Sequence, residues 1–146
     1  KATQLAIRES EKQKNYASES YQQAMKVYYK AHVRRGENSP SLQDSLNRFF
    51  GENVYTFMWG PSEFTATGNL LMYNRLKELA TIKVPTLLTA GEFDEARPSS
   101  VRYYTSLIPG AQFQVIPQAA HSTMGDNPKE NNRVLADFLL KMDGLN

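Results

Sequence analysis

Along residues 1–74, hydrophobic residues recur at helical spacing within a mostly polar sequence. The pattern predicts one helix over residues 2–13 and a second over residues 21–33, with Ser20 as N-cap in a capping box. A third helix should begin at Ser39-Pro40, with proline in its first turn, and end near Phe50-Gly51. No strand is expected in this part of the chain. These helices are too short and too polar to form a large core alone.

The pattern changes from Ile82 onward and alternates between strand and helix. Residues 84–91 and 112–117 are predicted to be buried strands, because each run is short, β-rich and bounded by Pro or Gly. Helices are expected between them, at about residues 99–107, and after them, over residues 128–142. This alternation predicts a parallel sheet with helical crossovers. Two strands cannot bury both faces of such a sheet, so we expect them to belong to a larger one.

Two candidate catalytic residues stand at the ends of the predicted strands. Asp94 follows the first strand and His121 follows the second. An acid and then a histidine at successive strand ends form the second half of the Ser…Asp…His order of an α/β-hydrolase sheet. Asp94 would orient His121 and stabilise its imidazolium form. The alternatives are that Asp94 caps the helix after Pro98 and that His121 is structural, but the pair favours catalysis.

The nucleophile that should accompany this pair is not found in the sequence. The motif G-x-S-x-G has no match, and the nearest string, Gly60-Pro61-Ser62-Glu63-Phe64, lacks the last glycine. A complete α/β-hydrolase usually needs more than about 200 residues, and this chain has 146. We therefore expect an α/β fold that holds the back half of a hydrolase, with the front half of the fold absent.

Composition argues against several other classes of protein. The net charge of +2 is small and spread along the chain, so no nucleic-acid partner is expected. With no cysteine and two histidines, no metal site or other cofactor is expected either. His32 falls at a predicted helix C-terminus, where cations are favoured, so we interpret it as structural. The apolar runs are shorter than the ~20 residues of a membrane span. No membrane partner and a cytoplasmic location are expected, although a chain that begins at Lys1 leaves a signal peptide undecided.

A third motif places Glu63 between the aromatic residues Trp59 and Phe64. A glutamate in such surroundings is costly to bury without a partner, so Glu63 is a candidate for binding a cation. The alternative is a turn flanked by core aromatic residues.

Five strings along the chain carry a family resemblance: Met58-Trp59-Gly60-Pro61-Ser62-Glu63-Phe64, Thr67-Gly68, Val84-Pro85-Thr86-Leu87, Gly91-Glu92-Phe93-Asp94-Glu95 and Ala120-His121. Together they resemble the proline iminopeptidase family of α/β-hydrolase serine aminopeptidases, which includes the tricorn-interacting aminopeptidase and related amino-acid amidases. Residues 28–33 and 106–110 extend the similarity over nearly the whole chain. The string around Trp59 is its most specific part.

The resemblance implies a role for each candidate residue. Asp94 matches the triad acid and His121 the triad base. Glu63 and Glu95 match the carboxylates that hold the free α-ammonium of the substrate, for which charge-assisted hydrogen bonds are suited. Trp59 and Phe64 would help to shape the substrate pocket. Residues 1–76 would form a helical cap domain and residues 77–146 the C-terminal part of the hydrolase domain. Residues 122–128 depart from the family's more usual histidine-rich version, which bears on substrate preference rather than on the triad.

We therefore expect a serine aminopeptidase that removes the N-terminal residue from peptides by hydrolysis. The expected N-terminal residue is proline. Its partners would be a peptide or aminoacyl substrate with a free N-terminus and the missing N-terminal half of the enzyme, on the same or a separate chain. This chain alone should be inactive. Two alternatives stay open: an amidase or esterase of the same fold, and a non-catalytic binding or assembly module.

Overall fold

The two predicted strands pair in parallel in the computed structural model, which describes residues 1–144 apart from the side chains of Asn47 and Phe49. β1 (Leu87–Gly91) lies beside β2 (Gln112–Ile116), with Leu87 opposite Gln112 and Gly91 opposite Ile116. β1 begins at Leu87 rather than at residue 84. Pro85 has no N–H to donate to a ladder, and Val84 before it is exposed.

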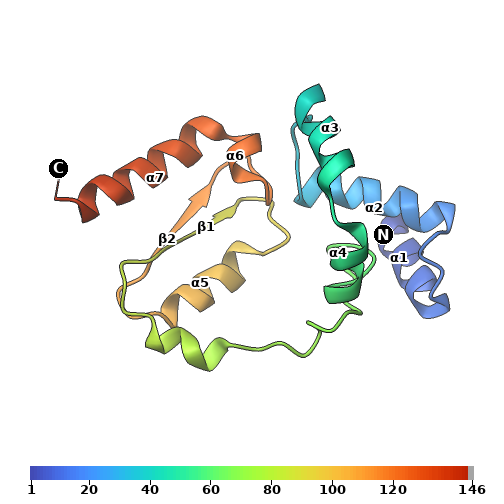
Figure 1. The fold of residues 1–146 in the computed structure, drawn as a ribbon, viewed down its shortest axis with the longest axis horizontal. Helices are drawn as coiled ribbons and strands as arrows, with labels where there is room; N and C mark the ends of the chain where they lie inside the picture. Colours follow the sequence, from blue (N-terminus) through green and yellow to red (C-terminus); the bar gives the residue numbers. More distant parts are fainter. Residues whose placement is uncertain (145–146) are drawn as a thin grey trace. The chain divides into compact units, whose positions relative to one another are not determined.

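Two helices flank this sheet. α5 (Pro98–Ser106) and α7 (Pro128–Met142) lie on opposite sides of the strands in Figure 1. Both begin with a proline in the first turn, where its missing N–H costs nothing, and the Asn127 side chain caps α7 by accepting the N–H of Glu130. The expected helices and the β-α-β-α order are thus confirmed.

The buried core of this part is small. One cluster consists of Ile116, Ala119 and Val134, with Leu87 packed against them; the other buried apolar residues of this part include Ala90, Val101, Ile108 and Ala120. α7 is buried only in part: Val134 is covered, whereas Leu135 and Leu139 are exposed. A sheet of two strands is too narrow to cover a whole helix face. Two short elements were not predicted from the sequence, a 3-10 helix η1 (Leu76–Thr81) and α6 (Thr123–Asp126).

Four helices precede the sheet: α1 (Ala2–Gln13), α2 (Glu19–His32), α3 (Pro40–Phe49) and α4 (Glu52–Met58). α1 and α3 match their predicted bounds closely, and Ser39 caps α3 by accepting the N–H of Leu42. α2 begins earlier than predicted because Ser18, not Ser20, accepts the N–H of Tyr21 as N-cap. α4 was not predicted; it is short, and its N-cap, Gly51, has no side chain to signal it.

Aromatic side chains of α2 cluster around Phe64. Tyr21 and Ala24 of α2 are buried. Phe64 packs against Tyr21, Tyr28 and Tyr29, with ring centroids 4.6 Å apart for the Tyr28 pair. The pairs with Tyr28 and Tyr29 are edge-to-face, and such pairs add to the stabilisation from buried area.

The chain divides into two compact units. The first holds Lys1–Tyr29 and Glu37–Asn74, and the second holds Lys30–Gly36 together with the chain from Arg75 onward. Helix α2 therefore begins in the first unit and ends in the second. Residues 30–36, which the sequence analysis placed in the cap domain, pack with the sheet. The functional division into a cap domain and a hydrolase part stays a prediction.

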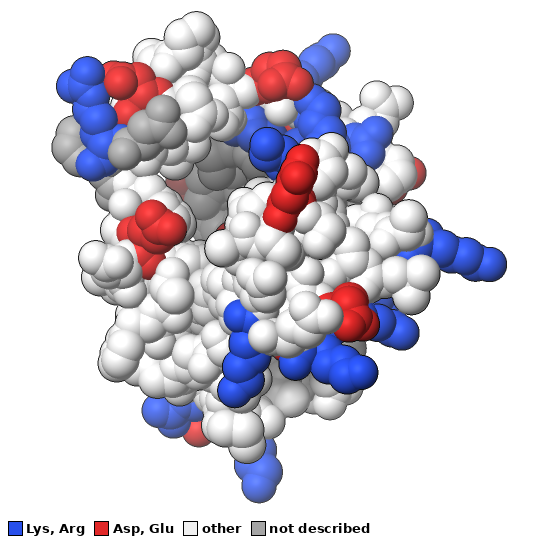
Figure 2. Space-filling view, turned by 90° about the vertical axis from the view of Figure 1, so that its right-hand side faces the viewer, with Lys and Arg blue, Asp and Glu red and all other residues white. Residues whose placement is uncertain are grey.

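The surface carries charges of both signs. On the face that Figure 2 shows, Lys and Arg side chains are interspersed with Asp and Glu side chains. Among the residues described, no helix is both long enough and apolar enough to cross a membrane.

Candidate active site

Asp94 and His121 meet at the ends of β1 and β2. The Nδ1 atom of His121 lies 2.9 Å from the Oδ1 atom of Asp94, a hydrogen bond that agrees with the expectation that Asp94 orients His121. The two side chains differ in exposure: that of Asp94 is 4% exposed and that of His121 is 57% exposed. A buried acid therefore holds an imidazole that is open to a reacting partner.

The carboxylate of Asp94 is fixed by its own loop. Its Oδ2 accepts the backbone N–H of Gly91 at 3.0 Å, and its Oδ1 accepts the N–H of Ala96 at 2.9 Å. Asp94 is not the N-cap of α5, a position that Arg97 occupies. Three donors on one buried carboxylate satisfy most of its acceptor sites, so its orientation is defined before any substrate binds.

This arrangement also sets the tautomer of His121. A carboxylate can only accept, so Nδ1 carries the hydrogen and the lone pair is on Nε2; the assignment follows from the hydrogen-bond network. An Nε2 lone pair on an exposed ring can remove a proton from a hydroxyl nucleophile.

Gly91 lets the two strand ends approach each other closely. A Cβ at this position would lie 2.1 Å from the carbonyl oxygen of Ala120, far inside contact distance. The loops are also joined directly, since Phe93 donates its N–H to Ala119 at 2.9 Å. A side chain at residue 91 would push Asp94 and His121 apart.

Sequence reasoning missed a third segment that contacts both loops. The carbonyl oxygen of His32, at the end of α2, accepts the N–H of Glu95 at 3.3 Å and the N–H of His121 at 3.1 Å. The Nδ1 atom of the same residue lies 2.8 Å from the carbonyl oxygen of Phe93. No local pattern in the sequence signals these contacts, because they join residues far apart in the chain.

Asp126 was missed as well. Burial would raise its pKa, but the backbone N–H groups of Gly36, Ala120 and Arg35, with the charge of Arg34, outweigh it and hold the pKa of Asp126 below its ordinary value. The carboxylate is therefore ionised at neutral pH. The sequence places Asp126 five residues after the candidate base, but no sequence pattern shows which groups its carboxylate would bind.

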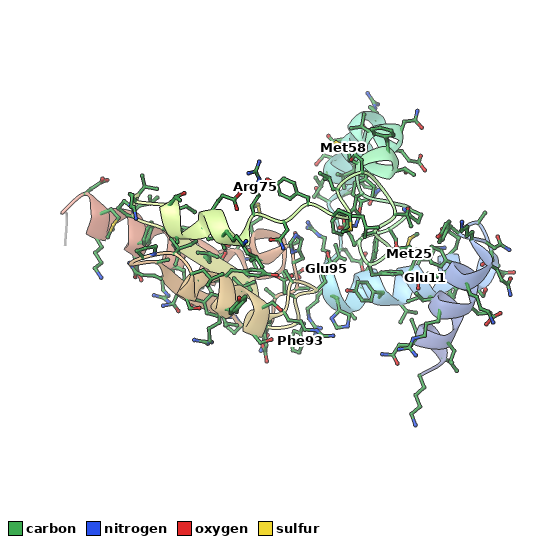
Figure 3. All side chains as sticks on the ribbon, turned by 90° about the horizontal axis from the view of Figure 1, so that it is seen from below. Glu11, Met25, Met58, Arg75, Phe93 and Glu95 are labelled. Carbon is green, nitrogen blue, oxygen red and sulfur yellow. The ribbon has the colours of Figure 1, made fainter. Side chains whose placement is uncertain are left out.

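Glu95 lies on the loop that carries Asp94 in the second unit (Figure 3), and its backbone N–H donates to the carbonyl of His32. It is half-buried. Its place beside the candidate acid is consistent with the expected role in substrate binding, which stays a prediction.

Glu63 and Trp59 lie in the first unit and line an apolar pocket of about 700 Å³. Two hydrogen bonds hold the Glu63 backbone: its N–H donates to the Tyr29 hydroxyl at 3.1 Å, and its carbonyl accepts the Trp59 indole N–H at 3.0 Å. Most of the remaining lining comes from α4, including Met58 (Figure 3), and consists of Gly51, Val54, Tyr55, Met58 and Leu70.

Two neighbours of Glu63 in that motif pack against other side chains, and the substrate-binding role expected for Phe64 stays a prediction. Phe64 belongs to the aromatic cluster with Tyr21, Tyr28 and Tyr29 and is not among the pocket-lining residues. Ser62, the serine of the string nearest to a nucleophile elbow, is 1% exposed and bonded to the Tyr21 hydroxyl. A buried serine in this position is not available to attack a substrate.

Among the described residues, no group of three His, Asp or Glu side chains could hold a metal ion.

Comparison with known proteins finds proline iminopeptidases among the relatives of this chain. The chain is 39% identical over 123 residues to the proline iminopeptidase of Heyndrickxia coagulans, an alignment that covers 84% of this chain and 43% of that protein. It is 36% identical over 137 residues to the proline iminopeptidase of Thermoplasma volcanium, covering 93% of this chain and 46% of that protein. The chain is related to the proline iminopeptidases. The family resemblance predicted from the sequence is thereby confirmed.

Solved structures agree with the sequence relatives. The crystal structure of the Mycobacterium smegmatis proline iminopeptidase superposes with a TM-score of 0.84 at 32% identity, covering 97% of this chain and 48% of that one. The crystal structure of VinJ superposes with a TM-score of 0.83 at 28% identity, covering 95% and 48%. No family model matches the chain. The predicted α/β-hydrolase fold class is confirmed, and the chain spans about half the length of the relatives it matches.

Proposed function

We propose that this chain supplies the acid and the base of a serine aminopeptidase of the proline iminopeptidase kind. His121 is the general base, Asp94 orients it, and the nucleophilic serine lies outside this chain. The observation that carries the proposal is the 2.9 Å hydrogen bond between a buried Asp94 and an exposed His121. It is supported by the relatives, which are named proline iminopeptidases.

The mechanism follows from the tautomer of His121. Its Nε2 removes the proton of the serine hydroxyl as that oxygen attacks the scissile carbonyl. The imidazolium that forms is stabilised by Asp94, because a buried carboxylate interacts strongly with a neighbouring positive charge. His121 then gives the proton to the leaving amine. Hydrolysis of the acyl-enzyme repeats these transfers with water as the nucleophile.

Substrate selection is assigned to Glu63 and Glu95. An exopeptidase must bind a charged amino terminus, and carboxylates form charge-assisted hydrogen bonds with an ammonium group. Glu63 lines a mostly apolar pocket, which suits a substrate residue that has a positive charge beside an apolar ring. Proline is such a residue, and we propose it as the preferred N-terminal residue.

The 146-residue chain by itself should not turn over substrate. His121 needs a nucleophile to activate, and the part of the chain described here offers no serine in an elbow. Removing a triad member leaves only residual catalysis. Robust hydrolysis of a prolyl-arylamide by the purified chain would contradict this part of the proposal. A cytoplasmic location and the lack of nucleic-acid and membrane partners likewise stay predictions.

A chimera tests the function directly. The N-terminal part of the Heyndrickxia coagulans enzyme, up to the start of the matched region, is joined to this chain and assayed with a prolyl-arylamide. We expect turnover that is lost in His121→Gln and in Asp94→Asn, and kept in the exposed-site control Asp137→Asn. A folded chimera whose activity survives His121→Gln would overturn the proposal. In-frame G-x-S-x-G codons upstream of this chain would support it independently.

A further inference from the structure

We propose that Asp126 is a positioning residue that holds the Asp94–His121 pair in register through residues Lys30–Gly36, here called the clamp segment. The geometric claim stands on the contacts of the second unit alone. Its consequence for catalysis rests on the proposed function.

The turn that carries His121 is fixed by three successive backbone N–H groups. That of Ala120 donates to Oδ2 of Asp126 at 2.9 Å, that of His121 to the carbonyl of His32 at 3.1 Å, and that of Ser122 to the carbonyl of Val33 at 2.8 Å. The imidazole of His121 is 57% exposed, so packing does little to orient it. Its direction therefore depends on the bond to Asp94 and on the backbone from which the ring projects.

The clamp segment holds the loop of Asp94 in the same way. The carbonyl of His32 that accepts from His121 also accepts the N–H of Glu95, so one oxygen atom joins the two loops. The ring of His32 is bonded to the carbonyl of Phe93, and the guanidinium of Arg35 lies 4.1 Å from the centroid of the Phe93 ring. Movement of the segment would therefore change the spacing of Asp94 and His121.

The carboxylate of Asp126 joins the clamp segment to the His121 turn by hydrogen bonds. Its Oδ1 accepts the N–H groups of Gly36 at 2.8 Å and Arg35 at 2.9 Å, while its Oδ2 accepts that of Ala120. An ionised carboxylate is the group suited to this task, since it accepts on both oxygens and forms stronger hydrogen bonds than a neutral acceptor.

An asparagine at position 126 could not accept hydrogen bonds from both the clamp segment and Ala120. The amide keeps one accepting oxygen and places an NH₂ group against an N–H on the other side. Either the clamp segment or the Ala120 N–H must lose its acceptor, and the His121 turn is released on one side. The bond from His121 Nδ1 to Asp94 then loses its fixed geometry.

The bond can be observed by proton NMR on the 146-residue chain at low temperature. The chain has only two histidines, so the low-field ring N–H resonance of His121 is assigned by its disappearance in His121→Gln. We expect this resonance in the wild type and in Asp137→Asn, a control that removes an exposed carboxylate bonded to Arg133 on α7. We expect its loss in Asp126→Asn, with the far-UV circular dichroism unchanged. A folded Asp126→Asn chain that keeps the wild-type resonance, or a wild type that lacks it, overturns the inference.

A second variant covers the case in which Asp126→Asn does not fold. Asp126→Glu keeps the charge but displaces the carboxylate by one methylene, and the resonance should shift or broaden; an unchanged resonance overturns the inference. In the complete enzyme, Asp126→Asn should lower kcat about 10- to 100-fold through misplacement of the base, with KM little changed. If the wild-type complete enzyme hydrolyses no aminoacyl substrate, the proposed function fails, while the NMR result still decides the positioning role.

Discussion

The hydroxyl oxygen of Tyr21 lies 2.7 Å from the Oγ of Ser62, and both side chains are buried. The same hydroxyl is 2.9 Å from the Oγ1 of Thr65, which donates to the carboxylate of Glu11 at 2.8 Å. Glu11 lies on α1 (Figure 3). This chain of hydrogen bonds ties both ends of the Glu63 turn to helices α1 and α2, so the pocket that Glu63 lines depends on it.

Tyr21→Phe should lower the free energy of unfolding by about 1–3 kcal/mol. The ring is retained, but the buried hydroxyls of Ser62 and Thr65 lose a partner that water cannot replace. Urea unfolding followed by circular dichroism measures the effect. The control is Tyr103→Phe, which removes a hydroxyl from a side chain on α5 that is 54% exposed and should change the free energy by less than about 0.5 kcal/mol. Equal effects of the two substitutions would show that the buried network is not stabilising.

Gly91→Ala should destabilise the chain and disturb the Asp94–His121 pair. The new Cβ would lie 2.1 Å from the carbonyl oxygen of Ala120, and because this neighbour is backbone, the loops must move apart at a cost of about 1–3 kcal/mol. Thermal unfolding measures the loss. Gly51→Ala is the matched control, since its Cβ would meet nothing closer than 3.8 Å. A Gly91→Ala chain with the Tm of Gly51→Ala would contradict the close approach of the strand ends.

Glu63→Gln should distinguish free-amine substrates from N-blocked ones in the complete enzyme. A hydrogen bond to a charged group contributes about 1.5–3 kcal/mol, so kcat/KM for a prolyl-arylamide should fall about 10- to 100-fold. N-blocked substrates and esters without an amino group present no ammonium, so their kcat/KM should change little. Glu52→Gln, at an exposed position of α4, is the control. Equal losses on both kinds of substrate would show that Glu63 is structural.

Asp126 should make stability depend on pH in the acid range. Its pKa in the folded chain lies below the ordinary value of 3.8, so the unfolded chain binds the proton more readily and stability rises with pH in this window. The contribution of the Asp126 carboxylate to stability is complete above pH 3.8, and it is lost as the pH falls through the lower pKa of the folded state. The free energies of unfolding of the wild type and of Asp126→Asn should therefore differ most above pH 3.8, and the difference should shrink on acidification. A difference that stays constant to the lowest pH at which both fold would contradict the assigned cause.

The local elements could be predicted because their causes are local. Ser39-Pro40 starts α3, Pro128 starts α7, and the short β-rich runs ending at Gly91 and Ile116 form the strands. The errors have equally local explanations: α4 has no side-chain cap, and two serines close together left the start of α2 ambiguous. Periodicity decides which residues face a core, but it does not choose between neighbouring caps.

By itself, the sequence determined the β-α-β-α order, the family resemblance and the pairing of Asp94 with His121, because parallel strands joined by a helix bring their carboxyl ends to one edge. Only the tertiary structure decided that residues 30–36 pack with the sheet, that the His32 carbonyl bridges the two loops, and that Asp126 closes the clamp segment onto Ala120. Each of these hydrogen bonds has a backbone N–H or C=O group on at least one side, and every residue but proline carries both. The backbone partners therefore leave no mark in the residue types and are chosen by the fold alone.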